Sequence, residues 1–208
     1  MKKFKTYFFD FDGTLVDSHD SLVEVFAGAY ASVGVKVPDG YVLRLMRIPL
    51  IQGYEELNGP TDEASIKIFV DNITRLLDEE RVLKLTKSYM DAIPNLKRLK
   101  SEGAKLGIVT SNNAKHVRDV LGFLNIDESL FSIIVGNEAT KKHKPNPDPI
   151  YKAMELLGLS DKDEVCYVGD ALDDKKTAIN AGVTPILVDR DRIYQCEDGL
   201  VINTLEEL

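Results

Sequence analysis

The chain has 208 residues, 44% of them hydrophobic and 29% charged, a balance typical of a folded globular protein with one substantial domain or a domain carrying an insert. Its net charge of −8 argues against a nucleic-acid partner, because affinity for a phosphate backbone comes from clustered Lys and Arg. No stretch approaches the ~18 apolar residues of a transmembrane helix, and Cys166 and Cys196 show neither CxxC pairing nor metal-ligand spacing, so we expect a cytoplasmic protein without a membrane partner.

Short apolar segments rich in β-branched residues recur along the chain and predict strands that are covered on both faces. The expected strands are 4–9, 105–110, 131–135, 165–168 and 184–188, with a short sixth candidate at 200–202. Helices are expected between them at 94–103, 113–124, 147–157 and 174–181, several of them bounded by Pro or Gly. This alternation from about residue 90 onward predicts an α/β fold with a doubly wound parallel sheet.

The segment from Ser18 to Arg81 breaks this rhythm, because it has helical periodicity and no convincing strand. One helix face is expected to carry Leu22, Phe26, Ala29, Tyr30 and Val33. Thr61 or Asp62 can cap a later helix with Ile66, Phe69, Ile73 and Leu77 on its apolar side. We therefore expect an inserted α-helical cap domain at 18–84 and a core domain formed by 1–17 and 85–208. The favoured role of the insert is a lid, and a helical subdomain without a role at the site is the alternative.

Polar residues follow several of the predicted strands at the point where each strand ends. In open α/β sheets, ligands bind at the carboxyl ends of the parallel strands, so these side chains are expected to meet at one edge. The residues concerned are Asp10 and Asp12 after the first strand, Ser111 and Asn112 after the second, Lys144 in the loop after the third, and Asp170 with Asp173 and Asp174 after the fourth. Carboxylates, hydroxyls and a lysine at one edge indicate a site for a phosphate and a metal.

The chemistry of phosphoryl transfer explains why such residues would gather. A carboxylate nucleophile is repelled by a dianionic phosphomonoester, and Mg²⁺ held by Asp10 and Asp170 would neutralise both groups. Lys144 would add a fixed positive charge, and the hydroxyl of Ser111 with nearby backbone N–H groups at a helix N-terminus would hold phosphoryl oxygens. Asp12 can serve as general acid toward the leaving group if its surroundings raise its pKa.

The chain resembles the haloacid dehalogenase superfamily in four motifs, in the same order and over nearly its whole length. They are Asp10-Phe11-Asp12-Gly13-Thr14-Leu15-Val16-Asp17-Ser18, Val109-Thr110-Ser111-Asn112, Lys144-Pro145, and Gly169-Asp170-Ala171-Leu172-Asp173-Asp174. Within that superfamily the phosphoglycolate-phosphatase-like branch, which carries a helical cap after the first motif, is the most similar.

The resemblance implies a role for each matched residue. Asp10 would be the nucleophile that forms an aspartyl-phosphate, and Asp12 would be the acid/base that also offers a backbone oxygen to Mg²⁺. Ser111, with Asn112, and Lys144 would bind the phosphate. Asp170 would be a metal ligand supported by Asp174, which spacing favours over Asp173. The implied activity is a Mg²⁺-dependent phosphatase acting on a small phosphorylated metabolite.

Some features remain open at the level of sequence. Arg47 stands where the family usually has Gly in a cap segment, and we hypothesise that it contacts an anionic part of the substrate's leaving group. A β-phosphoglucomutase-like sugar phosphomutase is the alternative activity, and a non-catalytic binding domain is a third. The sequence does not decide between monomer and dimer, nor among phosphoglycolate, pyrophosphate, nucleotides and sugar phosphates. Asp17 and Ser18 are expected to cap the first cap helix, and Asp189 is expected to be a surface turn residue.

Overall fold

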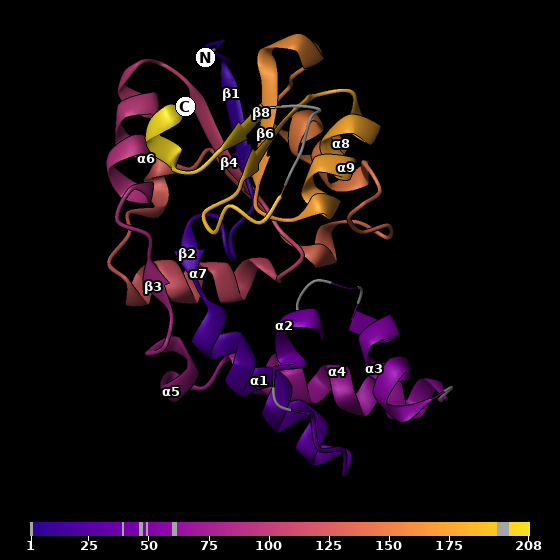
Figure 1. Ribbon diagram of the computed structural model, residues 1–208. Helices are drawn as coiled ribbons and strands as arrows, with labels where there is room; N and C mark the ends of the chain where they lie inside the picture. The colour runs from indigo at the N-terminus through magenta and orange to yellow at the C-terminus, as the bar shows by residue number, and fades with distance from the viewer. Residues whose placement is uncertain (1, 39, 46–47, 49, 60–61, 195–199) are drawn as a thin grey trace. The chain divides into compact units, whose positions relative to one another are not determined.

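The computed structural model describes residues 2–38, 40–45, 48, 50–59, 62–194 and 200–208. The chain divides into two compact units, one formed by Met1–Asp17 with Ser88–Leu208 and the other by Ser18–Lys87. Figure 1 follows the chain through both units and labels their elements. No helix among the described residues has both the length and the apolar character that a membrane span needs.

The first unit is built on a six-stranded sheet with the order β5-β4-β1-β6-β7-β8, in which each described pair of neighbours is parallel. Its strands are β1 (Thr6–Phe9), β4 (Lys105–Val109), β5 (Ile133–Val135), β6 (Val165–Gly169), β7 (Thr184–Val188) and β8 (Leu200–Ile202). The predicted doubly wound parallel sheet is confirmed. Two further strands of two residues each, β2 (Val16–Asp17) and β3 (Lys87–Ser88), form a separate sheet that is too short to leave a sequence signal.

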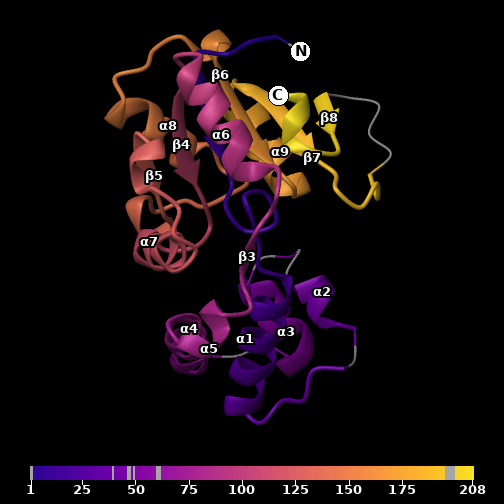
Figure 2. The same cartoon turned by 90° about the vertical axis from the view of Figure 1, so that its left-hand side faces the viewer.

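Helices cover both faces of the large sheet. The α-helices of this unit are α6 (Ala92–Ser101), α7 (Ala114–Phe123), α8 (Asp148–Leu156) and α9 (Leu172–Ala181), and short 3-10 turns lie at Glu128–Leu130, Asn137–Ala139, Lys162–Glu164 and Leu205–Glu207. Helices α8 and α9 pack together against one face, and α6 lies on the other, as Figures 1 and 2 show. Helix α6 begins two residues before Pro94, because a proline is tolerated in the first turn, where its missing N–H has no helical partner.

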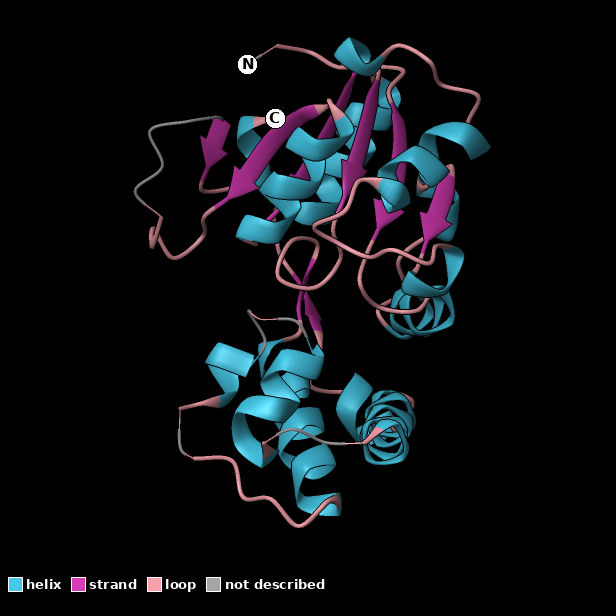
Figure 3. Cartoon of the chain, turned by 90° about the vertical axis from the view of Figure 1, so that its right-hand side faces the viewer, coloured by secondary structure: helices cyan, strands magenta, loops and turns pink. Residues whose placement is uncertain are grey.

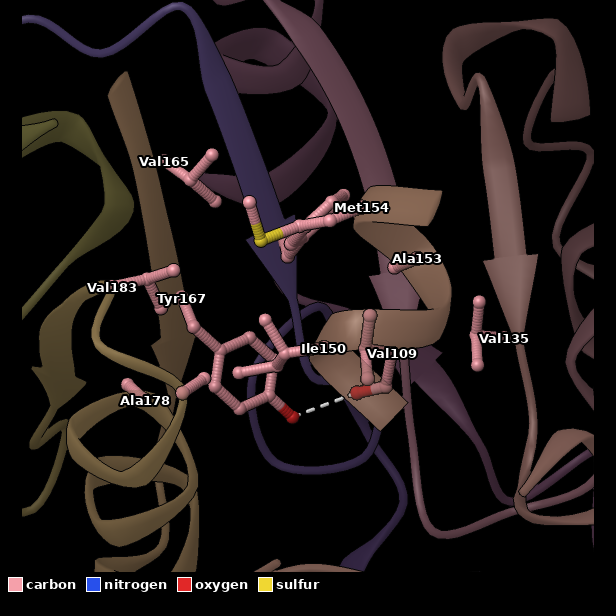
Figure 4. Packing of buried hydrophobic residues seen from close by; sticks show 11 residues of the cluster. Val109, Val135, Ile150, Ala153, Met154, Val165, Tyr167, Ala178 and Val183 are labelled. Carbon is pink, nitrogen blue, oxygen red and sulfur yellow. Dashed lines mark hydrogen bonds between the residues drawn. The ribbon is translucent and has the colours of Figure 1, made fainter. Parts of the chain in front are cut away.

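The strands of the large sheet are continuous apolar segments because helices cover both of its faces. All four residues of β1 are buried, as expected of a central strand with helices on both faces. Between the sheet and helices α8 and α9, Ile150 and Met154 pack against Tyr167 and Val165, as seen in Figure 4. Burying one such large side chain stabilises the fold by about 1.5–3 kcal/mol, so this layer holds the sheet edge and its loops in place.

The second unit contains helices α1 (His19–Ser32), α2 (Val42–Leu45), α3 (Leu50–Asn58), α4 (Glu63–Leu77) and α5 (Glu80–Leu83), drawn in cyan in Figure 3. Three aromatic rings meet among the aliphatic side chains of its core: the ring centroid of Phe69 lies 4.7 Å from that of Tyr30 and 4.6 Å from that of Tyr54. Asp62 caps α4 by accepting a hydrogen bond from the Ser65 N–H at 2.8 Å. Ser18 occupies the N-cap position of α1, but its side chain makes no capping hydrogen bond, so the expected cap is wrong for the Ser18 side chain.

Candidate active site

The carboxyl ends of β1, β4 and β6 carry the polar residues that the sequence singled out. Asp10 directly follows β1, and Asp170 directly follows β6, its neighbour in the sheet. Ser111 comes two residues after β4, the neighbour on the other side. Because these strands are parallel and adjacent, their ends lie at the same edge, and the polar loops meet there.

A buried lysine joins two of the acidic residues directly. The Nζ atom of Lys144 lies 2.6 Å from Asp174 Oδ1 and 3.0 Å from Asp10 Oδ1. The side chains of Lys144 and Asp174 are only 8% and 2% exposed, so this is an interior ion pair with little screening by water. One carboxylate oxygen from each of Asp10, Asp170 and Asp174 lies within 4.8 Å of the others. The structure thus brings these four predicted residues together.

The electrostatics of this cluster are unbalanced. Burial and the charge of Asp174 raise the pKa of Asp10 well above its usual value, although Lys144 acts in the opposite direction. Burial and Asp174 likewise raise the pKa of Asp170 to about 6. Burial alone would lower the pKa of Lys144, but the charges of Asp10 and Asp174 outweigh it and raise that pKa well above the usual value. Three carboxylates therefore share one ammonium, and a further positive charge would relieve their repulsion.

The donor set fits a hard divalent cation. Asp10 Oδ1 is buried and has no hydrogen-bond partner within the described residues, because its contact with Lys144 lacks the alignment of a hydrogen bond. Asp174 is already engaged through both oxygens: Oδ1 accepts from Lys144, and Oδ2 accepts from the Ala171 N–H at 3.0 Å. The cluster could therefore hold a metal ion on oxygen ligands, chiefly Asp10 and Asp170, with Asp174 holding the lysine.

Two glycines allow the backbone to approach the carboxylates. Gly13 has φ +76°, and a Cβ added there would overlap the carboxylate of Asp170. A Cβ at Gly169 would overlap the carboxylate of Asp174 in the same way. The site is therefore lined by backbone at these two points, and larger residues there would displace the acids.

We expect Gly13→Ala to lose any activity that depends on the carboxylate cluster, because the new Cβ would push Asp170 out of place. Gly103→Ala is the matched control: Gly103 has φ +90°, but a Cβ added there would meet nothing within 4 Å. Each substitution should cost about 1–2 kcal/mol in unfolding free energy from left-handed backbone strain alone. Denaturant unfolding together with kcat measurement checks this, and equal activity in both variants would contradict the close approach of Gly13 to Asp170.

The remaining predicted residues are arranged more loosely. Asp12 is half-buried, and its Oδ2 accepts a hydrogen bond from Asn112 Nδ2 at 3.3 Å. Ser111, in the loop that follows β4, is exposed to solvent. Asp173 points away from the cluster to Lys176, 3.1 Å distant, whereas Asp174 lies inside it. Arg47 lies outside the described residues.

Backbone donors near α7 differ from the expectation. The N–H groups of Asn112 and Asn113 already donate to Thr110 Oγ1 at 3.1 Å and to Asn112 Oδ1 at 3.0 Å. The Ala114 N–H donates to the carboxylate of Glu138. These three N–H groups are therefore engaged within the protein, which differs from the expectation that the N–H groups at this helix N-terminus are free to hold phosphoryl oxygens.

Two residues to which the sequence analysis gave no role at the cluster support it. The hydroxyl of Tyr167 donates to the Val109 carbonyl at 2.7 Å, shown dashed in Figure 4, and lies 3.2 Å from Lys144 Nζ. The hydroxyl of Thr14 donates to Asp170 Oδ1 at 2.9 Å. The role of Tyr167 was not predicted, because a tyrosine inside an apolar strand is expected to be a core residue. Only the alternation of side chains along β6 could have indicated which face of the sheet it lies on.

Asp189 was wrongly expected on the surface. It is 4% exposed, and its carboxylate accepts from the N–H groups of Ile193 and Tyr194, each at 2.8 Å. An aspartate after a strand gives the same sequence signal whether it shapes a buried loop or a surface turn. Here it organises the loop that follows β7.

The fold is an open parallel sheet whose carboxyl edge carries a buried lysine between acidic residues. Residues 7–188 match the family model of the haloacid dehalogenase-like hydrolases. The chain is 30% identical to a phosphoglycolate phosphatase from Pasteurella multocida over 191 residues, covering 88% of this chain and 84% of the relative. It is 27% identical to the pyrophosphatase PpaX of Halalkalibacterium halodurans, covering 98% of this chain and 94% of the relative.

Solved structures agree on the fold. A hydrolase of the haloacid dehalogenase-like family from Streptococcus pneumoniae superposes with a TM-score of 0.80 at 20% identity, covering 100% of this chain and 97% of that one. The chain therefore belongs to the haloacid dehalogenase-like hydrolases. The predicted family and the predicted enzyme class, a phosphatase of this family, are confirmed.

Proposed function

We propose that this phosphatase hydrolyses a small phosphomonoester through an aspartyl-phosphate on Asp10, with Mg²⁺ as cofactor. The observation that carries the proposal is the contact of Lys144 with both Asp10 and Asp174, with a carboxylate oxygen of Asp170 within 4.8 Å of theirs. A nucleophile, a fixed cation and a pair of oxygen ligands are the parts that phosphoryl transfer needs. The family membership of the chain supports the same chemistry.

In the first step, a carboxylate oxygen of Asp10 attacks phosphorus while the bond from phosphorus to the leaving oxygen breaks. Asp12 gives its proton to that leaving oxygen. In the second step Asp12 takes a proton from water, the water oxygen attacks phosphorus, and the bond to Asp10 breaks to release inorganic phosphate. Lys144 and the hydroxyl of Ser111 hold the phosphoryl oxygens. Bound Mg²⁺, on Asp10, Asp170 and the backbone oxygen of Asp12, would neutralise the charge of the phosphate and the nucleophile.

Charge and the names of the relatives support the proposed substrate class. A chain with net charge −8 must attract a phosphate locally through Lys144 and the metal. Relatives named for phosphoglycolate and for pyrophosphate point to small, strongly anionic phosphorylated metabolites as substrates. We further propose that residues 18–84 act as a cap that selects among them, with Arg47 contacting an anionic leaving group.

A screen of phosphorylated metabolites with detection of released phosphate tests this function. Phosphoglycolate, pyrophosphate, nucleotides and hexose phosphates form the panel, and we expect turnover of at least one small phosphomonoester. Conversion of a hexose 1-phosphate to its 6-phosphate without phosphate release would instead identify a phosphomutase. Absence of both products across the panel would favour the non-catalytic alternative.

Metal removal should abolish this activity reversibly. Treatment with EDTA is expected to stop phosphate release, and added Mg²⁺ should restore it, because three carboxylates with one ammonium cannot bind a dianion on their own. Asp170→Asn should need much more Mg²⁺ for half-maximal rate than the parent enzyme. Hydrolysis at the full rate in EDTA would rule out a metal-dependent mechanism.

A further inference from the structure

An arginine outside the four motifs contacts the first motif from the end of β7, which lies two strands from β1 in the sheet. Arg190 follows β7 at the same carboxyl edge, two residues after the strand ends. One terminal nitrogen of its guanidinium donates to the carbonyl oxygen of Thr14 at 2.9 Å, and the other donates to Asp91 Oδ2 at 2.9 Å. Its central carbon lies 3.7 Å from the centroid of the Tyr89 ring. The side chain is therefore held on both terminal nitrogens and on one face.

The partners of Arg190 are themselves fixed. The side chains of Arg190 and Asp91 are 18% and 11% exposed, so water screens their ion pair only weakly. Asp91 Oδ2 also accepts from the Leu205 N–H at 2.8 Å, which ties it to the C-terminal turn. On the other side, Asp189 shapes the loop that carries Arg190 by accepting two backbone N–H groups. These contacts restrict the guanidinium to one position more strongly than a solvent-exposed arginine would be restricted.

Thr14 links this arginine to the metal cluster. Its carbonyl accepts from Arg190, and its hydroxyl donates to Asp170 Oδ1 at 2.9 Å. Thr14 is fully buried, and its own N–H donates to the Phe11 carbonyl within the tight turn of the motif. Gly13, the preceding residue, lies against the carboxylate of Asp170. A shift of the turn at Thr14 would therefore move the donor that orients Asp170.

We propose that Arg190 is a positioning residue for Asp170, acting through Thr14, and that it thereby sets the affinity of the site for its divalent cation. This inference rests on the proposed function. Groups that orient metal ligands from outside the ligand shell commonly change metal affinity by about 10-fold or more. Asp91 and Tyr89 serve to hold the guanidinium, and Thr14 transmits its position.

Direct calorimetric titration with Mg²⁺ tests the proposal without relying on turnover. Arg190→Met should raise the Kd for Mg²⁺ roughly 10-fold, and Arg190→Lys should fall between it and the parent, because one ammonium cannot span both acceptors. In kinetics, the Mg²⁺ concentration for half-maximal rate should rise by a similar factor, while KM for substrate at saturating metal should change little. Arg98→Met is the matched control, since Arg98 tethers Leu208 and contacts Asn95 but not Thr14.

A double-mutant cycle separates positioning from general loss of stability. Thr14→Val removes the hydroxyl that reaches Asp170, so this single substitution should weaken Mg²⁺ binding. Thr14→Ser keeps the hydroxyl and should retain most of the Mg²⁺ affinity. Combined with Arg190→Met, Thr14→Val should add little further loss, because both changes act on one path. Thr14→Val also keeps the test open if Arg190→Met does not fold.

The outcomes distinguish the two proposals. A parent enzyme that binds no Mg²⁺ would overturn the proposed metal-dependent function. A parent that binds Mg²⁺ with the same Kd as Arg190→Met or Arg190→Lys would overturn the role of Arg190 and leave the function standing. An unchanged Kd in Thr14→Val, or fully additive losses in the double variant, would likewise overturn transmission through Thr14.

Discussion

Asp10→Asn should lower phosphate release by roughly 10⁴-fold or more while leaving the fold intact, because it removes the proposed nucleophile from a cooperating site. The amide nitrogen and oxygen of Asn cannot form the acyl phosphate, although they fill the same space. Stability should be equal or slightly higher, because burial and Asp174 already raise the pKa of Asp10 and so disfavour its charged form in the folded chain. Steady-state kinetics and thermal unfolding of purified variants measure both effects.

Asp173→Asn is the matched control for this substitution. Asp173 lies in the fourth motif but pairs with Lys176 outside the carboxylate cluster, so its turnover should stay close to that of the parent. Near-normal phosphate release by Asp10→Asn would refute nucleophilic catalysis by that residue. A large loss of turnover in Asp173→Asn would show that Asp173, and not only Asp170 and Asp174, is needed from the fourth motif.

Lys144→Met should have the largest effect on stability. It removes the ammonium that contacts Asp10 and Asp174 and leaves those buried carboxylates without their partner, a change that typically costs about 3–5 kcal/mol. Catalysis should be lost as well, because the fixed positive charge at the proposed phosphate site is gone. Chemical denaturation of the metal-free variant measures the loss in unfolding free energy. Lys152→Met, which breaks an exposed pair with Glu155, is the control and should change stability little.

The free energy of unfolding should depend on pH, in the parent protein and more strongly in Lys144→Met. The pKa of Asp170 is about 6, above the usual 3.8, and that of Asp10 is also raised, so the folded chain binds more protons than the unfolded chain in this range. The stability from these protonated carboxyls is present at low pH and is lost as pH rises from about 4 toward 6 and beyond. Without Lys144 this decline should steepen and extend to higher pH, and added Mg²⁺ should reduce it. Equal stability of Lys144→Met and parent at neutral pH would contradict the buried ion pair.

The strands and the edge at which the polar residues gather were predictable, because apolar runs and the ends of parallel strands leave clear signals. Asp10, Asp170 and Lys144 each follow such a run or occupy the loop after it, and the structure brings them together. Their chemical roles stay proposals.

What the sequence could not show depends on register and long-range packing. Tyr167 reaches Lys144 only because β6 pairs beside β1 in one register, and a tyrosine in an apolar strand carries no sign of that. The contact of Arg190 with Thr14 joins residues 176 positions apart. Applying the strand-end argument to β7 would have drawn attention to Arg190, but its acidic neighbours Asp189 and Asp191 read as a surface turn. Glu138 accepts a hydrogen bond from the Ala114 N–H at the start of α7, and it does so from a short 3-10 turn that the sequence did not predict.

Identification of the phosphorylated residue tests the central claim most directly. Enzyme quenched in acid during turnover of a phosphomonoester with a good leaving group would be digested and mapped by mass spectrometry, using Asp12→Asn to slow breakdown of the intermediate. We predict one phosphoryl group on the peptide that contains Asp10, removable by hydroxylamine as an acyl phosphate is. A phosphoryl group on another residue would contradict the account. So would the absence of any phosphoryl group if the parent enzyme releases phosphate at the full rate and the Asp10→Asn variant remains active.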